Sequence, residues 1–150
     1  KSDYPSTGSE SKILELSRDE KNSKIKAFEN PLTQSQLNKA RAAVRDVRMS
    51  EQVEEYLVQI ILATRNSEKY GGNLSDWLEF GASPRATIAL DICSKSLAWL
   101  DNRNFVTPDD IRSIAHDVLR HRLILSFEAE ANGISSDQVV DELLKVVPSA

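Results

Sequence analysis

The sequence is poor in the residues that build metal sites, disulfides and tight turns. Its 150 residues include one cysteine, two histidines, five glycines and five prolines. The lone Cys93 excludes an internal disulfide and is consistent with a reducing compartment. His116 and His121 would lie about 140° apart around a helix, so they cannot share a local metal site. We therefore expect no metal centre, and we interpret Cys93 as a small core residue.

Long apolar runs and a positive charge balance are also missing. No apolar run approaches the roughly 20 residues needed to span a bilayer, and the first residues of the sequence show no signal-peptide pattern. The formal net charge of −4 argues against a nucleic-acid partner, because phosphate backbones are bound by basic faces. These absences favour a soluble, cytoplasmic protein with no membrane partner. The chain starts at Lys1 without an initiating Met, so we expect a piece of a longer protein.

What the sequence does contain is a series of helix signals. Leu, Ile, Val and Ala dominate the apolar residues, which favours helices over a sandwich or barrel. Each of five short polar residues stands at a helix-capping position before an apolar stripe: Thr33, Ser50, Ser83, Thr107 and Ser135. The resulting helices are predicted at residues 34–46, 51–66, 84–101, 108–122 and 136–146. The expected fold class is all-α, an orthogonal helical bundle of about six helices with no reliable strand.

The apolar stripes predict which side of each helix is buried. The helix at 84–101 is predicted to bury one stripe: Ala86, Leu90, Cys93, Leu97 and Leu100. Residues 74–80 form an apolar cluster of one or two helical turns, in which Trp77 and Phe80 are interpreted as local core, with a partner site as the alternative. Near the N-terminus, Tyr4-Pro5-Ser6 looks like a strand-to-helix junction. After it, Ile13, Leu14 and Leu16 are predicted to face inward, and residues 21–28 to form a connector or a frayed helix. Residues 122–127 could be extended.

The segment Gly81-Ala82-Ser83-Pro84-Arg85-Ala86 carries the strongest functional signal. Ser83 as the cap and Pro84 at the first helical position account for a helix start. They do not account for Arg85, because a positive charge in the first turn opposes the helix dipole. An Arg at this place would instead reinforce the phosphate-binding tendency of a helix N-terminus. On physical grounds alone, a plain helix start and a phosphate contact both stay open.

Other candidate chemistry is weaker. The phosphate-binding pattern G-x-x-x-x-G-K-[ST] does not occur, since Gly71-Gly72 lacks the Lys and hydroxyl that it requires. No catalytic triad or Cys-His pair has motif support. The chain therefore has no evident means of hydrolysing a nucleotide unaided. Arg41, Arg45 and Arg48 would share one helix face, which is either solvated or in contact with an anionic ligand or a neighbouring subunit.

Several segments, taken in order, resemble the MoxR family of AAA+ ATPases. They span nearly the whole chain: Tyr4-Pro5-Ser6, Val44 to Val47, Ser50 to Tyr56, Ala63-Thr64-Arg65, Gly81 to Ala86, Phe105 to Ile111 and Val118 to Leu123. The resemblance implies that residues 1–150 are the family's helical lid domain. Residues 1–6 would be the tail end of an ATPase core that precedes the lid in the same polypeptide. Residues 67–80 look longer than the family's usual connection before Gly81.

The resemblance also implies a site. Arg85 matches the family's second-sensor arginine, a catalytic residue that approaches the terminal phosphates of ATP. Ser83 belongs to the same cofactor-binding motif, and Tyr4 and Pro5 match positions near the adenine end of the pocket. ATP and Mg²⁺ would bind to the full-length ATPase, whereas no cofactor is expected on this fragment, which would be inactive alone.

The implied partners are the ATPase core in cis and further copies of the protein in a ring, usually a hexamer. The implied role is a chaperone-like one, in which other proteins are assembled or activated, often with von Willebrand factor A-domain partners. The alternative is a free-standing helical protein-interaction module with no nucleotide role. A helical DNA-binding domain is a further alternative, against which the acidic balance speaks.

Overall fold

The computed structural model describes residues 6–21 and 30–149, and the chain divides into two units, residues 1–34 and 35–150. In the first unit, helix α1 spans Thr7–Lys21. Its stripe predicted to face inward is open to solvent, since Ile13, Leu14 and Leu16 are 50%, 53% and 60% exposed. That prediction is wrong because the described part of this unit holds no second helix to cover them. Most of the predicted connector lies outside the described residues.

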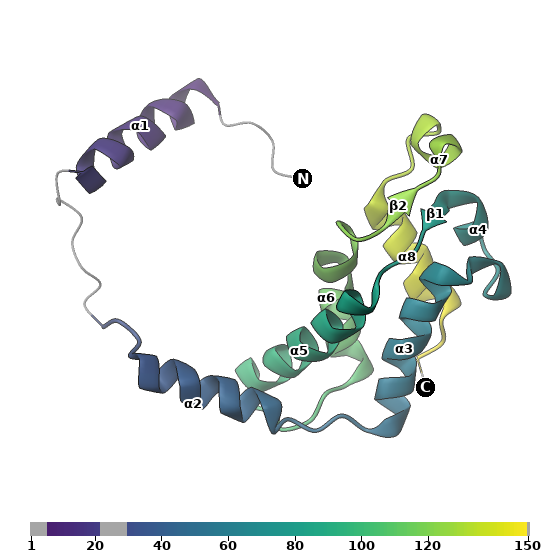
Figure 1. The fold of residues 1–150 in the computed structure, drawn as a ribbon, viewed down its shortest axis with the longest axis horizontal. Helices are drawn as coiled ribbons and strands as arrows, with labels where there is room; N and C mark the ends of the chain where they lie inside the picture. The colour runs from purple at the N-terminus through teal and green to yellow at the C-terminus, as the bar shows by residue number, and fades with distance from the viewer. Residues whose placement is uncertain (1–5, 22–29, 150) are drawn as a thin grey trace. The chain divides into compact units, whose positions relative to one another are not determined.

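The second unit is mainly helical, as predicted (Figure 1). Its elements, in chain order, are α2 Gln34–Arg45, α3 Glu51–Arg65, the 3-10 helix η1 Ser67–Lys69, α4 Leu74–Trp77, β1 Leu78–Phe80, α5 Pro84–Leu100, α6 Pro108–Leu119, β2 Ile124–Leu125, α7 Phe127–Ala131 and α8 Ser136–Val146. Each of the five predicted helices is present, with ends that differ from prediction by at most three residues. The all-helical fold class is therefore confirmed. No described helix is long and apolar enough to cross a membrane.

The helices begin where their capping residues predict. The backbone N–H of Val53 donates to Ser50 Oγ at 3.3 Å at the start of α3. Thr107 and Asp110 form a reciprocal capping box at the start of α6, and Ser135 and Gln138 form another at α8. These bonds satisfy backbone N–H groups that a helix leaves without partners in its first turn. The sequence signal and the local structure therefore agree for these three helices.

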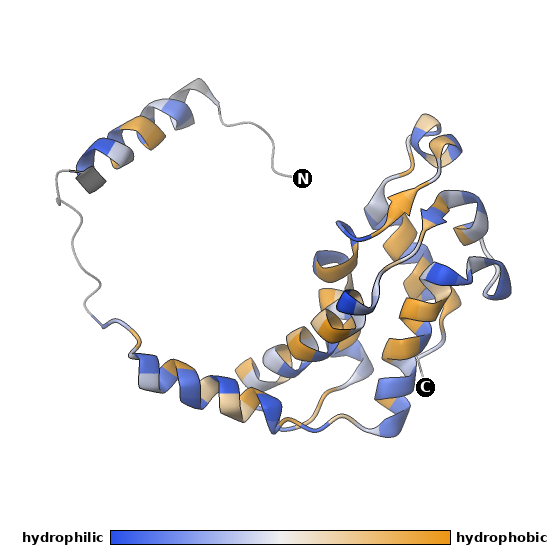
Figure 2. Ribbon diagram, viewed as in Figure 1, coloured by the Kyte–Doolittle hydropathy of each residue, from blue (hydrophilic) through white to orange (hydrophobic). Residues whose placement is uncertain are grey.

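The core lies where α3, α5, α6 and α8 pack on one another. The largest fully buried side chains include Ile60 of α3, Leu90 of α5, Ile111 of α6 and Leu143 of α8. Figure 2 shows α3 changing from hydrophilic at its start to hydrophobic further along, where it meets this core. Burying large aliphatic side chains stabilises a fold by about 1.5–3 kcal/mol each, so this cluster is the main driving force for folding.

The buried stripe of α5 differs from the predicted one. The buried residues are Ala86, Leu90, Ser94 and Ala98, which repeat every four positions. Cys93 lies only partly buried against the core, and Leu100 is 67% exposed. The prediction for Leu100 is wrong because Leu100 lies about 100° around the helix from the middle of this row, so it faces away from the core.

Two short strands correct the expectation of a fold without strands. β1 and β2 pair antiparallel, with Leu78 opposite Leu125 and Phe80 opposite Ile124. The apolar cluster at 74–80 thus forms one helical turn followed by a strand, and residues 124–125 are extended. Phe80 is 59% exposed, so its interpretation as local core is wrong, whereas Trp77 packs against the core. The long connection before Gly81 therefore packs on the bundle through α4, which contacts α7 and α8.

Candidate functional site

The first turn of α5 carries the residues that the sequence singles out. Ser83 stands at the N-cap position in an extended conformation, and Pro84 is the first helical residue. The Ser83 side chain makes no capping hydrogen bond. Its carbonyl oxygen instead accepts from the N–H of Ala86 at 2.8 Å. The helix start is therefore fixed by Pro84 and the backbone, and the Ser83 hydroxyl is left exposed.

Arg85 is exposed on this first turn, which contains no acidic residue. Within the described residues, its side chain has no hydrogen-bond or salt-bridge partner, and its backbone N–H has no acceptor. The turn thus presents a guanidinium, a free N–H, a free hydroxyl and the positive end of a 17-residue helix. Such a set of donors attracts phosphate oxygens.

The chain just before this turn is fastened to the C-terminal end of α3. The N–H of Ala82 donates to Thr64 Oγ1 at 2.9 Å, and the Ala82 carbonyl accepts from Arg65 Nε at 2.8 Å. The Thr64 hydroxyl in turn donates to the Ile61 carbonyl at 2.7 Å. Both backbone polar groups of Ala82 are therefore held by consecutive residues of α3. We call this arrangement of Thr64, Arg65 and Ala82 the α3 latch.

Gly81 brings the two segments close enough for the latch to form. A Cβ placed on Gly81 would lie 2.2 Å from the Thr64 carbonyl oxygen and 2.9 Å from the Arg65 backbone nitrogen. Real Cβ atoms do not approach backbone that closely, so only glycine allows this contact. Ala82 and Ala86 are buried on either side of the turn, at 1% and 0% exposure. The position of Arg85 is consequently set by α3 as well as by its own helix.

The structure brings together some of the predicted site residues. Ser83 and Arg85 lie on one turn, whereas Tyr4 and Pro5 are outside the described residues. Sequence reasoning missed the role of Thr64 and Arg65 in holding this turn. Their only signal was the Ala63-Thr64-Arg65 segment in the ordered resemblance. Among the described residues, no group of three or more His, Cys, Asp or Glu side chains could hold a metal ion.

Comparison of the chain with known proteins shows which family it resembles. The AAA lid domain family matches residues 75–143, which include the whole of α5. Chaperone MoxR1 of Mycobacterium tuberculosis is 40% identical over 94 residues, covering 62% of this chain and 25% of that protein. Protein MoxR of Methylorubrum extorquens is 34% identical over 67 residues, covering 45% of this chain and 19% of that protein.

A solved structure extends the likeness to nearly the whole chain. It is that of a candidate ATPase from Cytophaga hutchinsonii, with a TM-score of 0.79 and 33% identity, and the match covers 99% of this chain and 45% of that one. The chain carries an AAA lid domain of the MoxR family. The protein YeaC of Bacillus subtilis is also similar to it, being 32% identical over 144 residues, which cover 96% of this chain and 42% of YeaC. The lid chain thus spans less than half the length of each of these proteins.

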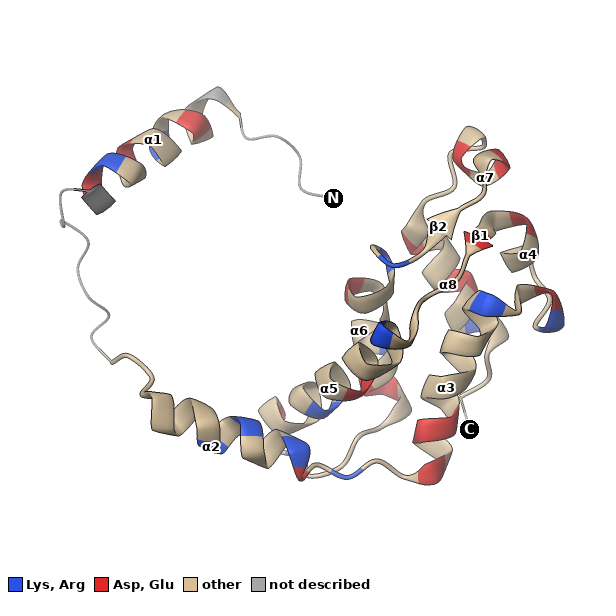
Figure 3. Ribbon diagram, viewed as in Figure 1, with Lys and Arg blue, Asp and Glu red and all other residues tan. Residues whose placement is uncertain are grey.

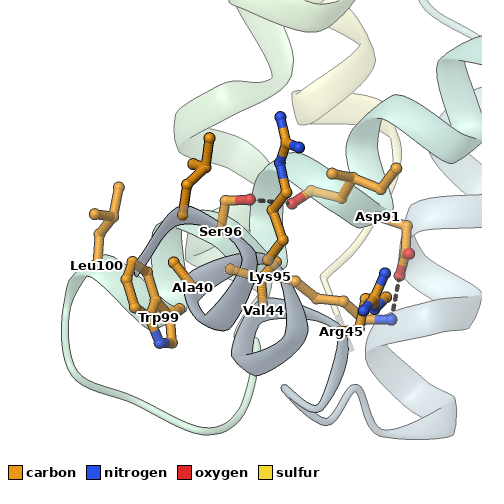
Figure 4. A pocket seen from close by; sticks show the side chains of 11 residues that line it. Ala40, Val44, Arg45, Asp91, Lys95, Ser96, Trp99 and Leu100 are labelled. Carbon is orange, nitrogen blue, oxygen red and sulfur yellow. Dashed lines mark hydrogen bonds and ion pairs between the residues drawn. The ribbon is translucent and has the colours of Figure 1, made fainter. Parts of the chain in front are cut away.

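The lid also has an apolar groove between α2 and α5, with a volume of about 550 Å³. Its walls include Leu37 and Val44 of α2 and Ile92, Trp99 and Leu100 of α5. Figure 4 shows Trp99 and Leu100 at one end of this groove and Arg45 and Asp91 at the other. None of the α2 residues is fully buried, so the apolar side of this helix is only partly covered.

The rim of the groove is mainly basic. Arg41 and Arg45 of α2 line it, and Lys95 of α5 pairs with Asp91 at 2.9 Å. Figure 3 shows the basic residues of α2 in blue, and the acidic residues that open α3 in red. Two residues of the predicted basic face, Arg41 and Arg45, therefore lie beside an apolar groove. Arg48 instead lies after α2 and bridges to the segment before α6 through its backbone, which donates to Asn104 and accepts from Val106.

Proposed function

We propose that this chain is the nucleotide-sensing lid of a MoxR-type ATPase, and that Arg85 contacts the terminal phosphates of ATP bound with Mg²⁺. The observation that carries the proposal is the exposed Arg85 in the first turn of α5, with no acidic residue in that turn. A cation there opposes the helix dipole and costs a few tenths of a kcal/mol unless an anion lies beside it. A bound phosphate would remove that cost.

The donors present fit a phosphate group. Arg85 offers a planar fork that suits phosphate oxygens, and its N–H and the Ser83 hydroxyl add neutral donors beside it. ATP would supply the phosphoryl group whose charge these donors stabilise, and the ATPase core would supply Mg²⁺ and the remaining machinery. The lid's own residues would bind and orient the phosphates. Tyr4 and Pro5 are proposed, from the family resemblance, to lie near the adenine.

The proposed partners follow from the family. The lid would work with an ATPase core in cis, in a ring of identical chains, a hexamer, with a chaperone-like role in the cytoplasm. One relative is named a chaperone, which supports this role. A von Willebrand factor A-domain protein is the partner class proposed for the ring. The open groove between α2 and α5 supports the alternative, a protein-interaction module without a nucleotide role.

Substitution of Arg85 in the complete ATPase tests the proposal. A charge-assisted hydrogen bond is worth roughly 1.5–3 kcal/mol, so Arg85→Ala should lower ATP turnover by about 10- to 100-fold. The melting temperature should stay the same, because Arg85 is exposed and has no partner to lose within the described residues. The control is Lys69→Ala, which removes an exposed positive charge of η1, and it should leave turnover unchanged.

Two results would contradict the proposal. Turnover equal to that of the wild type would remove Arg85 from the nucleotide site and favour the interaction module. A large fall in melting temperature would assign Arg85 a structural role instead. Arg85→Lys should recover only part of the activity, because an ammonium is a point charge and cannot form the two parallel hydrogen bonds of a guanidinium.

A further inference from the structure

We propose that Thr64 and Arg65 are positioning residues for ATP turnover, acting through Arg85 by way of the α3 latch. This inference rests on the proposed function of Arg85. Thr64 is buried, at 2% exposure, and Arg65 is exposed. We do not propose that either residue contacts the nucleotide. Both act on Ala82, which lies three residues before Arg85 in the chain.

The α3 latch restricts movement of the loop that leads into Arg85. Both hydrogen-bonding groups of Ala82 are engaged by α3, and Pro84 fixes its own φ angle two residues later. Only Ser83 separates these two fixed points. The start of α5 is therefore tied to the end of α3, and the guanidinium of Arg85 extends from a backbone that cannot shift independently.

This precision matters more for turnover than for folding. Misplacing a catalytic group by about 1 Å can cost up to about 100-fold in rate, because the contact must match the transition state. Thr64 Oγ1 both donates to Ile61 and accepts from Ala82. The donor bond lies within α3, so the bond to Ala82 is the one that connects this hydroxyl to the site. Arg65 reaches the same residue with Nε alone.

Thr64→Val in the complete ATPase is the first test, since valine keeps the shape and loses the hydroxyl. Measured on folded protein well below its melting temperature, kcat should fall about 10-fold, and the amide of Ala82 should exchange its hydrogen faster. Thr64→Ser keeps the hydroxyl and should restore most of kcat. The matched control is Ser94→Ala, which removes another buried hydroxyl that bonds only within α5 and should leave kcat unchanged.

A double-mutant comparison separates this inference from the proposed function. If Thr64 acts through Arg85, Thr64→Val should have no further effect on kcat in an Arg85→Ala background. An equal fold-loss in both backgrounds would overturn the positioning role while leaving Arg85 in the site. An Arg85→Ala enzyme with normal kcat would instead overturn the proposed function itself.

Arg65 gives a second test that does not depend on a buried residue. Arg65→Lys keeps the positive charge but loses the Nε–H that bonds the Ala82 carbonyl. We expect kcat to fall several-fold with the melting temperature unchanged, because the residue is exposed. Full activity of Arg65→Lys would show that its charge, and not the latch, is what the enzyme uses.

Discussion

Arg103 and Asp110 form a two-pronged ion pair across the turn between α5 and α6. Arg103 Nη1 lies 2.8 Å from Asp110 Oδ2, and Nη2 lies 2.6 Å from Oδ1. The same carboxylate accepts from the backbone N–H and the hydroxyl of Thr107, at 2.7 and 2.9 Å. Asp110 is buried, so each of these bonds replaces water that the carboxylate has lost. One side chain thus caps α6 and fastens the turn that follows α5.

We predict that Asp110→Asn lowers the free energy of unfolding by about 2 kcal/mol, because the amide cannot match both prongs of a guanidinium. Asp101→Asn is the matched control, since Asp101 also pairs with Arg103 but its side chain is 56% exposed. That change should cost less than about 0.5 kcal/mol. Urea unfolding of both variants checks the prediction, and equal losses would contradict it.

The Asp110 carboxylate should also make part of the free energy of unfolding sensitive to acid. Burial alone would raise its pKa, but the hydrogen bonds from Arg103 and Thr107 outweigh burial and hold the pKa below the ordinary value of 3.8. A lowered pKa in the folded state stabilises the fold above the unfolded pKa, and this contribution is lost as pH falls through the folded pKa. The difference in stability between wild type and Asp110→Asn should therefore shrink below about pH 3.8. A difference that stays constant down to pH 2 would contradict this assignment.

Local signals predicted the main helices because each start rests on residues close together in sequence. Thr107 with Asp110 and Ser135 with Gln138 satisfy the first-turn N–H groups by themselves, whatever the rest of the chain does. Periodicity also predicted that Ala86 and Leu90 of α5 are buried. It failed at Leu100, because the side of α5 that is buried depends on how closely its neighbours approach.

The strands and the latch could not be predicted in this way. β1 pairs with β2 across more than 40 residues of chain, and two- or three-residue strands leave almost no periodic pattern. Thr64 follows the apolar residues of α3 in the sequence, and nothing local to it reveals that Ala82 lies against it. For the candidate site, the sequence predicted Arg85 and Ser83 but not that α3 holds their turn in place.

We predict that Gly81→Ala destabilises the lid by about 2–3 kcal/mol, since the added Cβ would overlap the backbone of Thr64 and force α3 away from β1. Its backbone lies outside the left-handed region, so the loss would come from overlap and not from an unfavourable φ angle. Gly8→Ala in α1 is the control, because nothing lies within 4 Å of the added atom. Thermal unfolding of both variants checks this, and a Gly81→Ala protein as stable as wild type would contradict the close approach.

Ser83 and Thr107 occupy the same position, the N-cap, at the starts of α5 and α6. Thr107 accepts from the N–H of Asp110 at the start of α6, whereas the Ser83 side chain caps nothing at the start of α5. Thr107→Ala should therefore cost about 1 kcal/mol or slightly more, as the loss of a capping hydroxyl usually does. Ser83→Ala should leave the melting temperature unchanged.

Measuring the ATP affinity of the same two variants shows whether the Ser83 hydroxyl, which makes no capping hydrogen bond, contacts the nucleotide. If it bonds a phosphate oxygen beside Arg85, as the proposed function requires, its loss removes a neutral hydrogen bond of about 1 kcal/mol, so ATP should bind about 5-fold more weakly. Thr107→Ala should leave ATP affinity unchanged, since it lies at the start of a different helix. A stable Ser83→Ala protein with normal ATP affinity would remove Ser83 from the site, and an unstable one would show that its hydroxyl caps α5 after all.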